Sequence, residues 1–472
     1  MGSINVLKIM LISILLAECA NNEITQAPEP ILPVPTEKQL NWQKKEMLMF
    51  VHFGIKTFYP SSDHMGDGTE NPKKFNPKHF NANQWVEAAK AGGFKGIVLT
   101  SKHHDGFCNG QTETTDHCLK SSPWRNGKAD VVKEVADACH NGGLLFGLYS
   151  SIYDKNYEVS GRDKNAYSAY YEAQLTELLT RYGKVDELWF DGFGAENMAV
   201  DFNKVSEIIK RYQPEALIYD SGTLVEYMPE DCARWPGAHG GVKDPNWSFT
   251  SENGPWYPAE ASVIAQGNWF YNNTAISSLE QLKDYYRNTV GLNAVALINV
   301  APNSDGLIDE ASVERLEEFS SWIDSLEENT LTRGNEFKIS ARSVRGDDDK
   351  TFGPRRLTDG NYDTYFATDD SVKTVSIEID FGSPQKIEGV VLQEYIPLGQ
   401  RVSSYQIECF NGEKWEKIAS QKTIGYKRLI MGNTKETGGK LFPETIRIRL
   451  VINDSRGAPV INTFDVIAAL ER

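Results

Sequence analysis

The stretch Glu187-Leu188-Trp189-Phe190-Asp191-Gly192 gives the clearest indication of the fold, because a short apolar run ends abruptly in a carboxylate followed by glycine. Short apolar runs bounded by polar or turn residues are typical of buried parallel strands. In barrel enzymes, the residues at the carboxyl ends of such strands carry the chemistry. An Asp-Gly pair is also a common turn. The role of Asp191 therefore depends on what the other strands place beside it.

Strands and helices alternate on both sides of this stretch. Such alternation predicts parallel strands joined by right-handed crossovers, and its length favours an α/β fold with a (β/α)8-like barrel over residues 37–332. An open doubly wound sheet is the alternative, but no glycine-rich phosphate loop follows the first strand. Other strands are expected at residues 47–53, 96–100, 144–149, 216–219 and 294–300, and helices at residues 83–91, 129–140, 167–182, 202–212, 279–290 and 311–326.

Two regions depart from this alternation. Residues 228–270 are rich in Trp, Gly, Pro and Asn, and we expect them to build the rim of a site. After Arg333 the helical periodicity disappears, and short alternating stretches are separated by turn residues. That pattern predicts a C-terminal β-sandwich over residues 337–472.

The overall charge and the cysteines exclude several classes of function. The 472-residue chain has a formal net charge of −16, which argues against a nucleic-acid partner because phosphate binding needs a positive face. The five cysteines beyond Cys19 show no CxxC spacing, so neither a zinc site nor a disulfide scaffold is indicated. A bond between Cys108 and Cys118 is one alternative, and unpaired buried thiols are the simpler interpretation.

The N-terminus has the pattern of a secretory signal over residues 1–19, with a lysine followed by a short apolar run. The run ends at Leu16-Ala17-Glu18-Cys19, which resembles a bacterial lipoprotein signal. We therefore expect an exported protein, periplasmic or anchored to the outer membrane of a bacterium through a lipid on Cys19. Glu18 departs from the small residue usual before that cysteine, and an ordinary cleaved signal is the alternative. The proline-rich residues 20–36 are expected to form an extended tether.

Polar side chains follow three other predicted strands. His52 follows the first strand, His103 and His104 follow the second, and Tyr149 ends the third. Because these strand ends meet at one end of a barrel, we expect the side chains to form a polar pocket. A pocket rich in His, Trp and Tyr can hydrogen-bond hydroxyl groups and stack on a sugar ring. A metal site at His103 and His104 is a weaker hypothesis, because neighbouring residues on a strand point to opposite faces.

At these residues the chain resembles a known family. The segments MFVHFG, LTSKHHDGFC, TDHCLKSSPWRNGKADVVKEVADAC, GLYSS and ELWFDG are similar, in order, to the α-L-fucosidases of glycoside hydrolase family 29, particularly the branch acting on branched fucosides. The resemblance covers roughly residues 42–326. It implies a retaining exo-α-L-fucosidase that hydrolyses terminal fucosyl residues of an oligosaccharide or glycoconjugate by double displacement, without a catalytic cofactor. By position it implies Asp191 as nucleophile, His52, His103 and His104 as sugar contacts, and Tyr149 and Trp189 as pocket neighbours.

The general acid/base departs from the family pattern. Relatives carry a glutamate at the end of a segment like RWVGNE, whereas the corresponding segment here, RWPGAH, runs from Arg234 to His239. Arg234 is counted among the substrate contacts. Glu260 matches a family motif and is the first candidate to replace the missing carboxylate, with Glu252 and His239 as the alternatives. An imidazole can serve as a general acid near neutral pH.

Two further departures leave the substrate and the activity open. Relatives carry a Glu-Trp pair before the sequence GDGTE, and here His64 and Met65 occupy those sugar-binding positions. Asn109 stands where an aromatic residue is usual. The alternatives are a glycosidase for a related sugar such as an α-L-galactoside, and a catalytically impaired glycan-binding protein.

The C-terminal region resembles a second module. The sequence RRLTDGNYDTY, with IEIDFG downstream, is similar to the coagulation factor 5/8 type C, or discoidin-like, sandwich, over residues 337–470. The resemblance implies a module that can bind carbohydrate. The turn from Asp359 to Thr364 could hold a structural Ca²⁺, since hard oxygen ligands cluster there. A plain Asp-Gly-Asn turn is the alternative.

Overall fold

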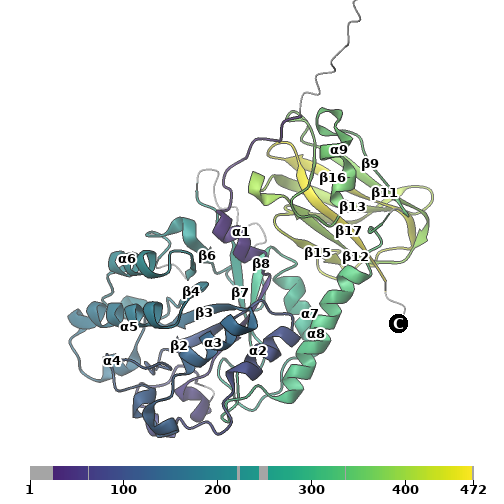
Figure 1. Cartoon of the computed structure of the whole chain (residues 1–472). Helices are drawn as coiled ribbons and strands as arrows, with labels where there is room; N and C mark the ends of the chain where they lie inside the picture. The colour runs from purple at the N-terminus through teal and green to yellow at the C-terminus, as the bar shows by residue number, and fades with distance from the viewer. Residues whose placement is uncertain (1–24, 62, 221–223, 244–253, 335, 470–472) are drawn as a thin grey trace, which may run out of the picture.

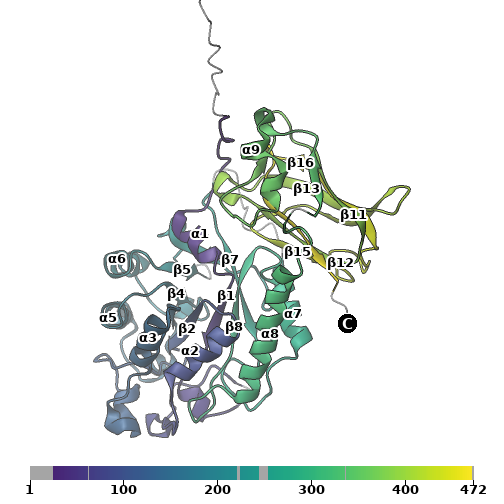
Figure 2. The same ribbon diagram turned by 45° about the vertical axis from the view of Figure 1, so that its right-hand side comes forward.

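The computed structural model describes residues 25–469, apart from residues 62, 221–223, 244–253 and 335. Figure 1 shows a barrel surrounded by helices and, beside it, a β-sandwich, with α8 running from one to the other. Figure 2 shows the same arrangement after a 45° turn. The predicted architecture, a (β/α)8-like barrel followed by a C-terminal sandwich, is confirmed.

The barrel is closed by eight parallel strands. β1 pairs with β2 on one side and with β8 on the other, which closes the sheet. Parallel strands place all their carboxyl ends at one end of the barrel, where barrel enzymes build their sites. The strands are β1 (Met47–Val51), β2 (Gly96–Lys102), β3 (Leu145–Ser150), β4 (Glu187–Phe190), β5 (Leu217–Asp220), β6 (Cys232–Arg234), β7 (Ala259–Ile264) and β8 (Ala294–Asn299).

Amphipathic helices cover the outside of the barrel, and one short helix covers its amino end. The short helix α1 (Glu37–Gln43) begins at a capping box formed by Thr36 and Gln39. Its Gln39 side chain donates to the carbonyl oxygens of Cys232 and Trp256, which fixes the helix beneath β6. The other helices are α2 (Ala82–Ala91), α3 (Val131–Gly142), α4 (Lys155–Val159), α5 (Tyr167–Arg181), α6 (Phe202–Tyr212), α7 (Leu279–Asn288) and α8 (Glu310–Glu328).

Strand β4 explains why the sequence motif was informative. Side chains alternate between the two faces of a strand. Leu188 and Phe190 join the apolar core between the strands and the helices, whereas Trp189 joins the cluster inside the barrel. Glu187 and Asp191 share the inward face of Trp189, so this one strand carries two carboxyl groups into the barrel, one on each side of an indole ring.

Residues 228–270 are more regular than the sequence predicted. They contain η7 (Pro229–Asp231) and the strands β6 and β7. β6 has only three residues, and β7 has the sequence AEASVI, in which a glutamate and small residues replace the expected apolar run. Both strands are held by pairing with longer neighbours, which local hydrophobicity does not reveal.

The C-terminal region consists of two antiparallel sheets that enclose their own apolar core. One sheet has the order β10-β17-β12-β15 and the other β14-β13-β16-β11-β9. Its elements are β9 (Lys338–Ala341), α9 (Asp349–Phe352), β10 (Phe366–Ala367), β11 (Val375–Gln385), β12 (Ile387–Glu394), β13 (Val402–Phe410), β14 (Trp415–Gln421), β15 (Arg428–Met431), β16 (Thr445–Ser455) and β17 (Val460–Ala468).

The sandwich is joined to the barrel by both polar and apolar contacts. Lys427 Nζ lies 2.8 Å from Glu46 Oε2 at the amino end of the barrel. Leu429, Met431 and Ile467 belong to the same apolar cluster as the barrel core. The two parts therefore share a core, and the sandwich lies on the side away from the carboxyl ends of the barrel strands.

The proline-rich segment does not form a free tether in its described part. Arg345, Arg401 and Arg456 of the sandwich donate to backbone carbonyl oxygens of residues 26–32. The chain approaches so closely that a Cβ on Gly399, which has a φ of 90°, would lie 1.9 Å from the carbonyl oxygen of Ile31. Residues 25–35 are thus part of the sandwich surface. The predicted signal and Cys19 lie outside the described residues.

Two smaller predictions, on the cysteines and on the Asp359 turn, can be compared with the structure. Cys108 and Cys118 are free buried thiols, as are Cys139, Cys232 and Cys409, so the alternative Cys108–Cys118 bond is not formed. The Asp359 carboxylate accepts from Asn361 N, Thr364 Oγ1 and Arg356, so the turn is closed by its own donors. Within the described ranges, no helix is long and apolar enough to cross a membrane.

Candidate active site

The carboxyl ends of the barrel strands surround a pocket of about 1100 Å³. The polar side chains predicted at the strand ends line this pocket, with the exception of Arg234. Residues from the loops after β6 and β7 complete the lining. Its predicted members are His52, His64, His103, His104, Tyr149, Trp189, Asp191 and His239, and its further members include Met65, Phe193, Glu196, Tyr219, Glu226, Trp235, Ser262 and Trp269.

Asp191 lies in this pocket with both carboxylate oxygens oriented. Oδ2 accepts from Tyr149 OH at 3.0 Å and lies 3.3 Å from His104 Nε2. Oδ1 accepts from Phe193 N at 3.0 Å. Burial alone would raise the pKa of Asp191, but these donors and the charge of His104 hold it below the usual value. An ionised, oriented carboxylate of this kind can attack an electrophilic carbon.

Hydrogen bonds on both sides orient the ring of His104. Ser151 Oγ donates its single proton to the carbonyl oxygen of Tyr153 at 2.8 Å. The same Oγ lies 2.6 Å from His104 Nδ1 and therefore accepts a proton from that nitrogen. His104 Nε2 lies 3.3 Å from Asp191 Oδ2 and 3.4 Å from Tyr149 OH. The ring is thus held between Ser151 on one side and Asp191 and Tyr149 on the other.

His52 is a neutral ring whose tautomer is fixed by Asn299. Asn299 donates its amide N–H to the carbonyl oxygen of Trp269 at 2.7 Å, so its Oδ1 accepts from His52 Nδ1, also at 2.7 Å. Burial lowers the pKa of His52 to about 3, so the ring is neutral. Its Nε2 is left as an acceptor, which suits a sugar hydroxyl.

Two other histidines line the pocket as neutral rings. Burial lowers the pKa of His103 well below its usual value, and the neighbouring His104 lowers it further. The ring of His103 stacks on Tyr149 at 5.5 Å between centroids. Burial, followed by the charge of His104, also lowers the pKa of His64. Burial therefore keeps His52, His103 and His64 neutral where they line the pocket.

Stacked aromatic rings form the floor of the pocket. Trp189 stacks on Tyr219 from β5, with centroids 4.0 Å apart and planes inclined by 2°, and on Tyr149 from β3 at 5.2 Å. Burial, then the charge of Asp191, raises the pKa of the Tyr149 hydroxyl, so it remains a donor. The floor therefore connects the stacked rings directly to Asp191.

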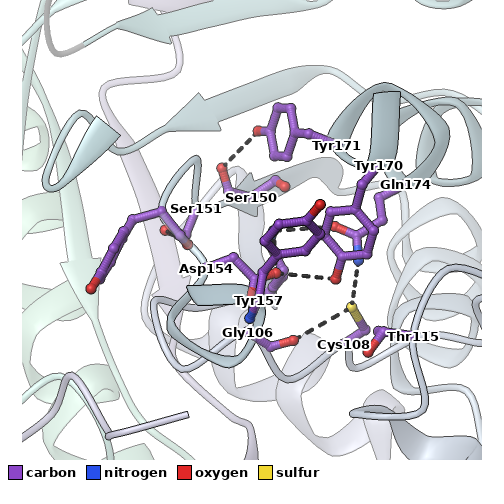
Figure 3. A network of polar contacts seen from close by, with 12 residues as sticks. Gly106, Cys108, Thr115, Ser150, Ser151, Asp154, Tyr157, Tyr170, Tyr171 and Gln174 are labelled. Carbon is purple, nitrogen blue, oxygen red and sulfur yellow. Dashed lines mark hydrogen bonds and ion pairs between the residues drawn. The ribbon is translucent and has the colours of Figure 1, made fainter. Parts of the chain in front are cut away.

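A buried polar network behind the pocket holds the ends of β2 and β3 together (Figure 3). The Lys102 ammonium lies 3.1 Å from Asp154 Oδ2, and burial would lower its pKa, but the Asp154 charge raises it. Asp154 also accepts from Tyr170 OH at 3.1 Å, and Tyr171 OH donates to the carbonyl oxygen of Ser150. This network fixes the strand ends that carry His103, His104 and Ser151.

His239, one of the predicted acid/base candidates, lines the pocket. Its Nδ1 lies 2.9 Å from Ser262 Oγ, and its ring contacts Trp235 and Trp269 at 5.6 Å between centroids. Trp235 is 43 % exposed and Phe193 is 59 % exposed, so two large aromatic side chains are open to solvent at the pocket. Such rings can stack on a bound sugar.

Two predicted site residues, Glu260 and Arg234, are not brought into the pocket. Glu260 is fully buried inside the barrel, where its Oε1 accepts from Trp189 Nε1 at 2.7 Å, so it lies beneath the floor and cannot reach a glycosidic oxygen above it. Arg234 lies over the ring of Tyr257 at 5.1 Å and does not line the pocket. Glu252 lies outside the described residues.

The metal hypothesis finds no ligand set in the structure. His103 stacks on Tyr149, while His104 is held between Ser151 and Asp191. Among the residues that the structure describes, no group of three or more His, Cys, Asp or Glu side chains could hold a metal ion.

Several residues that orient the site were assigned no role from the sequence, although Ser151 stands at a predicted strand end. Ser151, Ser262 and Asn299 each contact a pocket histidine. Ser262 lies in β7, Asn299 is the last residue of β8, and Ser151 directly follows β3. Their position next to strand ends could have suggested them, but the partner of each is fixed only by the closure of the barrel.

Comparisons with known proteins identify the family of each domain. The family model "Alpha-L-fucosidase" matches residues 34–328, and the model "F5/8 type C domain" matches residues 338–462. Alpha-L-fucosidase 1 of Arabidopsis thaliana is 36% identical over 454 residues, covering 92% of this chain and 87% of that protein.

Solved structures show the same arrangement of both domains. A putative alpha-L-fucosidase from Bacteroides thetaiotaomicron has a TM-score of 0.86 at 30% identity, covering 94% of this chain and 99% of that one. A Ruminococcus gnavus GH29 fucosidase, solved in complex with fucose, has a TM-score of 0.82 at 29% identity, covering 96% and 98% of the two chains. The chain therefore belongs to the α-L-fucosidase family, glycoside hydrolase family 29, and carries a C-terminal F5/8 type C domain.

Proposed function

We propose that this protein is a retaining exo-α-L-fucosidase that removes terminal α-L-fucosyl residues from glycans by double displacement, with Asp191 as nucleophile. The observation that carries the proposal is the environment of Asp191, whose ionised carboxylate is oriented by three donors inside a pocket lined with sugar-binding side chains. Attack by Asp191 on the anomeric carbon forms a glycosyl ester as the bond to the leaving oxygen breaks. Water then cleaves the ester, and two inversions give retention.

The stereochemical course is tested by following hydrolysis of an aryl α-L-fucoside by proton NMR. Retention predicts that α-L-fucose is the first product. If β-L-fucose appears first, the double displacement is wrong even though the enzyme is active. Asp191→Ala provides the second arm, because loss of the carboxylate removes the ester-forming step and turnover should fall to background.

We further propose that His239 protonates the leaving oxygen and then activates water. Support comes from its place in the pocket and from the Ser262 contact that orients its ring. His239→Ala should lose more activity on fucosides with a poor leaving group than on activated aryl fucosides, which need little protonation. Added azide should restore turnover and give a fucosyl azide with the substrate's anomeric configuration.

The matched controls are Glu196→Gln and Glu226→Gln. These are the two other carboxylates that line the pocket within the described part of the chain, and both are exposed. If either variant, and not His239→Ala, shows the dependence on the leaving group together with azide rescue, the acid/base assignment moves to that residue.

The same assay should include an α-L-galactoside, which differs from the fucoside by one hydroxyl group. His64 and Met65 line the pocket at positions where relatives carry a different pair, and this favours testing the alternative sugar directly. We expect the fucoside to be preferred. A higher kcat/KM for the L-galactoside would reassign the substrate without changing the roles of Asp191 and His239.

Export and lipid attachment at Cys19 are part of the proposal and rest on the sequence pattern of residues 1–19. In a bacterial host, the full chain should incorporate labelled palmitate and partition with membranes. Cys19→Ala should abolish both. A wild-type protein recovered without label from the soluble fraction would contradict the lipoprotein assignment.

A further inference from the structure

Two carboxyl groups face one another inside the barrel below the floor of the pocket. Glu187 begins β4, and Glu260 is the second residue of β7. Their exposed fractions are 2 % and 0 %. Glu187 Oε2 accepts from Trp42 Nε1 of α1 at 2.9 Å, and Glu260 Oε1 accepts from Trp189 Nε1 at 2.7 Å. Each carboxyl group thus uses one oxygen to hold an indole.

The two remaining oxygens, Glu187 Oε1 and Glu260 Oε2, have no donor among the described residues. The two side chains lie within hydrogen-bonding reach of each other. Two facing acceptors in an apolar interior would leave both oxygens unsatisfied and their charges unscreened. A single proton between the oxygens removes both costs, because one carboxyl group then donates to the other.

We propose that Glu187 and Glu260 share one proton and act together as a positioning pair that holds the Trp189 indole at the floor of the pocket. A second proton has no place, because the other two oxygens already accept an indole N–H. The pair therefore carries one negative charge. Burial raises the pKa of both groups, and the charge of Glu187 raises that of Glu260 further, in agreement with a retained proton.

The pair acts on the site through Trp189. The indole stacks on Tyr219 and Tyr149, and Tyr149 OH donates to Asp191. If the indole lost its acceptor, its N–H would be left unpaired in the interior and the ring could turn out of the stack. Glu260 is therefore a positioning residue, and the carboxyl group predicted to be an acid/base instead supports the residues that contact substrate.

Glutamine substitutions distinguish a shared proton from two independent carboxylates. In Glu260→Gln, the amide oxygen accepts from Trp189, and the amide N–H₂ donates to Glu187, which takes the charge. In Glu187→Gln, the amide oxygen accepts from Trp42, and the amide N–H₂ donates to Glu260, which takes the charge. In the double variant, both oxygens accept indole N–H groups and two N–H₂ groups face each other.

The expected result is strong non-additivity. Each single glutamine variant should retain kcat/KM on an aryl α-L-fucoside to within about threefold, whereas the double variant should lose at least about tenfold more than either. Glu260→Ala should lose activity, and Glu260→Gln should restore it. The same pattern is expected in the thermal unfolding midpoint, so a double variant that fails to fold also supports the proposal.

Glu394→Gln in β12 is the matched control, since Glu394 is also fully buried. Its carboxylate accepts the backbone N–H groups of Arg401, Val402 and Gly425. An amide N–H₂ there would face a donor, so this single substitution should lower the unfolding midpoint although Glu260→Gln does not. The infrared difference spectrum of wild type minus Glu260→Gln at neutral pH should show a protonated carboxyl band that the variant has lost.

Three results would overturn the positioning pair. In one, Glu260→Gln folds normally but loses turnover that azide restores, as expected for an acid/base. In the second, the double variant is as active and stable as the single variants. In the third, the protonated carboxyl band is absent. The activity readout rests on the proposed fucosidase function, but the unfolding and infrared measurements need no substrate, so failure of one proposal is distinguishable from failure of the other.

Discussion

The polar layer above Trp189 and the polar layer below it both bury carboxyl groups, and they differ in the donors that surround those groups. In the upper layer, Asp191 receives hydrogen bonds from Tyr149, His104 and the Phe193 backbone. In the lower layer, Glu187 and Glu260 receive one indole N–H each. Donors hold the pKa of Asp191 down, whereas burial with few donors raises those of the two glutamates.

The comparison shows that the number of donors, more than the residue type or its place on a strand, decides what a buried carboxyl group can do. β4 contributes Glu187 to one layer and Asp191 to the other. An ionised carboxylate that opens on a pocket can serve as a nucleophile, whereas a carboxyl group that retains a proton in a sealed interior serves the packing.

The largest expected effect comes from converting the upper carboxylate into an amide. Asp191→Asn keeps the size of the side chain but removes the nucleophile, so kcat/KM on an aryl α-L-fucoside should fall roughly a thousandfold or more. Glu260→Gln, the same chemical change one layer lower, should cost less than about threefold. Equal losses in the two variants would remove the distinction between the layers.

The next effect concerns the buried ion pair behind the upper layer. Lys102→Met leaves Asp154 as an unpaired charge with an exposed fraction of 0 %, and such a loss costs about 3–5 kcal/mol of unfolding free energy. Denaturant unfolding measures it. Lys133→Met, which breaks a pair with Asp137 at the surface, is the control and should leave the midpoint unchanged. If Lys102→Met also left the unfolding midpoint unchanged, the ion pair with Asp154 would not stabilise the strand ends of the upper layer.

A smaller effect is expected when the orientation of His104 is disturbed. Ser151→Ala removes the acceptor for His104 Nδ1, so kcat/KM should fall about tenfold, the upper value for one ordinary hydrogen bond. The acid limb of the pH profile should move to higher pH, because the donor that lowers the pKa of Asp191 is weakened. Ser101→Ala, which removes an equally buried hydroxyl bonded to the carbonyl oxygen of Tyr149, should leave that limb in place.

The smallest effect is a difference in how stability depends on pH. The lowered pKa of Asp191 gives a contribution that is present above the ordinary carboxyl pKa and is lost as the pH falls through the lower folded value. The raised pKa values of Glu187 and Glu260 give a contribution that is present at acid pH and is lost as the pH rises toward the folded values.

Unfolding free energies of wild type, Asp191→Asn and Glu260→Gln should be measured from acid to neutral pH. The differences of the two variants from wild type should change with pH with slopes of opposite sign, each on the order of 1 kcal/mol per pH unit. Slopes of the same sign would show that folding shifts the pKa values of the carboxyl groups in the same direction in both layers.

Much of this molecule could be predicted from local sequence, because strand runs such as residues 187–190 and helical periodicity depend on nearby residues. The barrel, the sandwich and the strand ends that carry His52, His104 and Asp191 were found in this way. β6 and β7 were missed, since their short or polar sequences are held by neighbouring strands.

The other differences concern contacts between distant segments. Glu260 matches a family motif, and only the closed barrel shows that it lies below Trp189, opposite Glu187. Likewise, the proline content of residues 25–35 predicts an extended chain but gives no sign of the three arginines, Arg345, Arg401 and Arg456, that bind it to the sandwich.

The most direct test of the two-layer account is to trap the covalent intermediate. In a 2-deoxy-2-fluoro-L-fucosyl fluoride, the 2-fluoro group slows both steps of a retaining mechanism, while the good fluoride leaving group keeps formation of the ester faster than its breakdown. The labelled enzyme should therefore accumulate and can be digested and sequenced by mass spectrometry. The account predicts one labelled peptide, with the sugar on Asp191. A label on Glu187, Glu260 or another carboxylate, or continued turnover with no label, would contradict it.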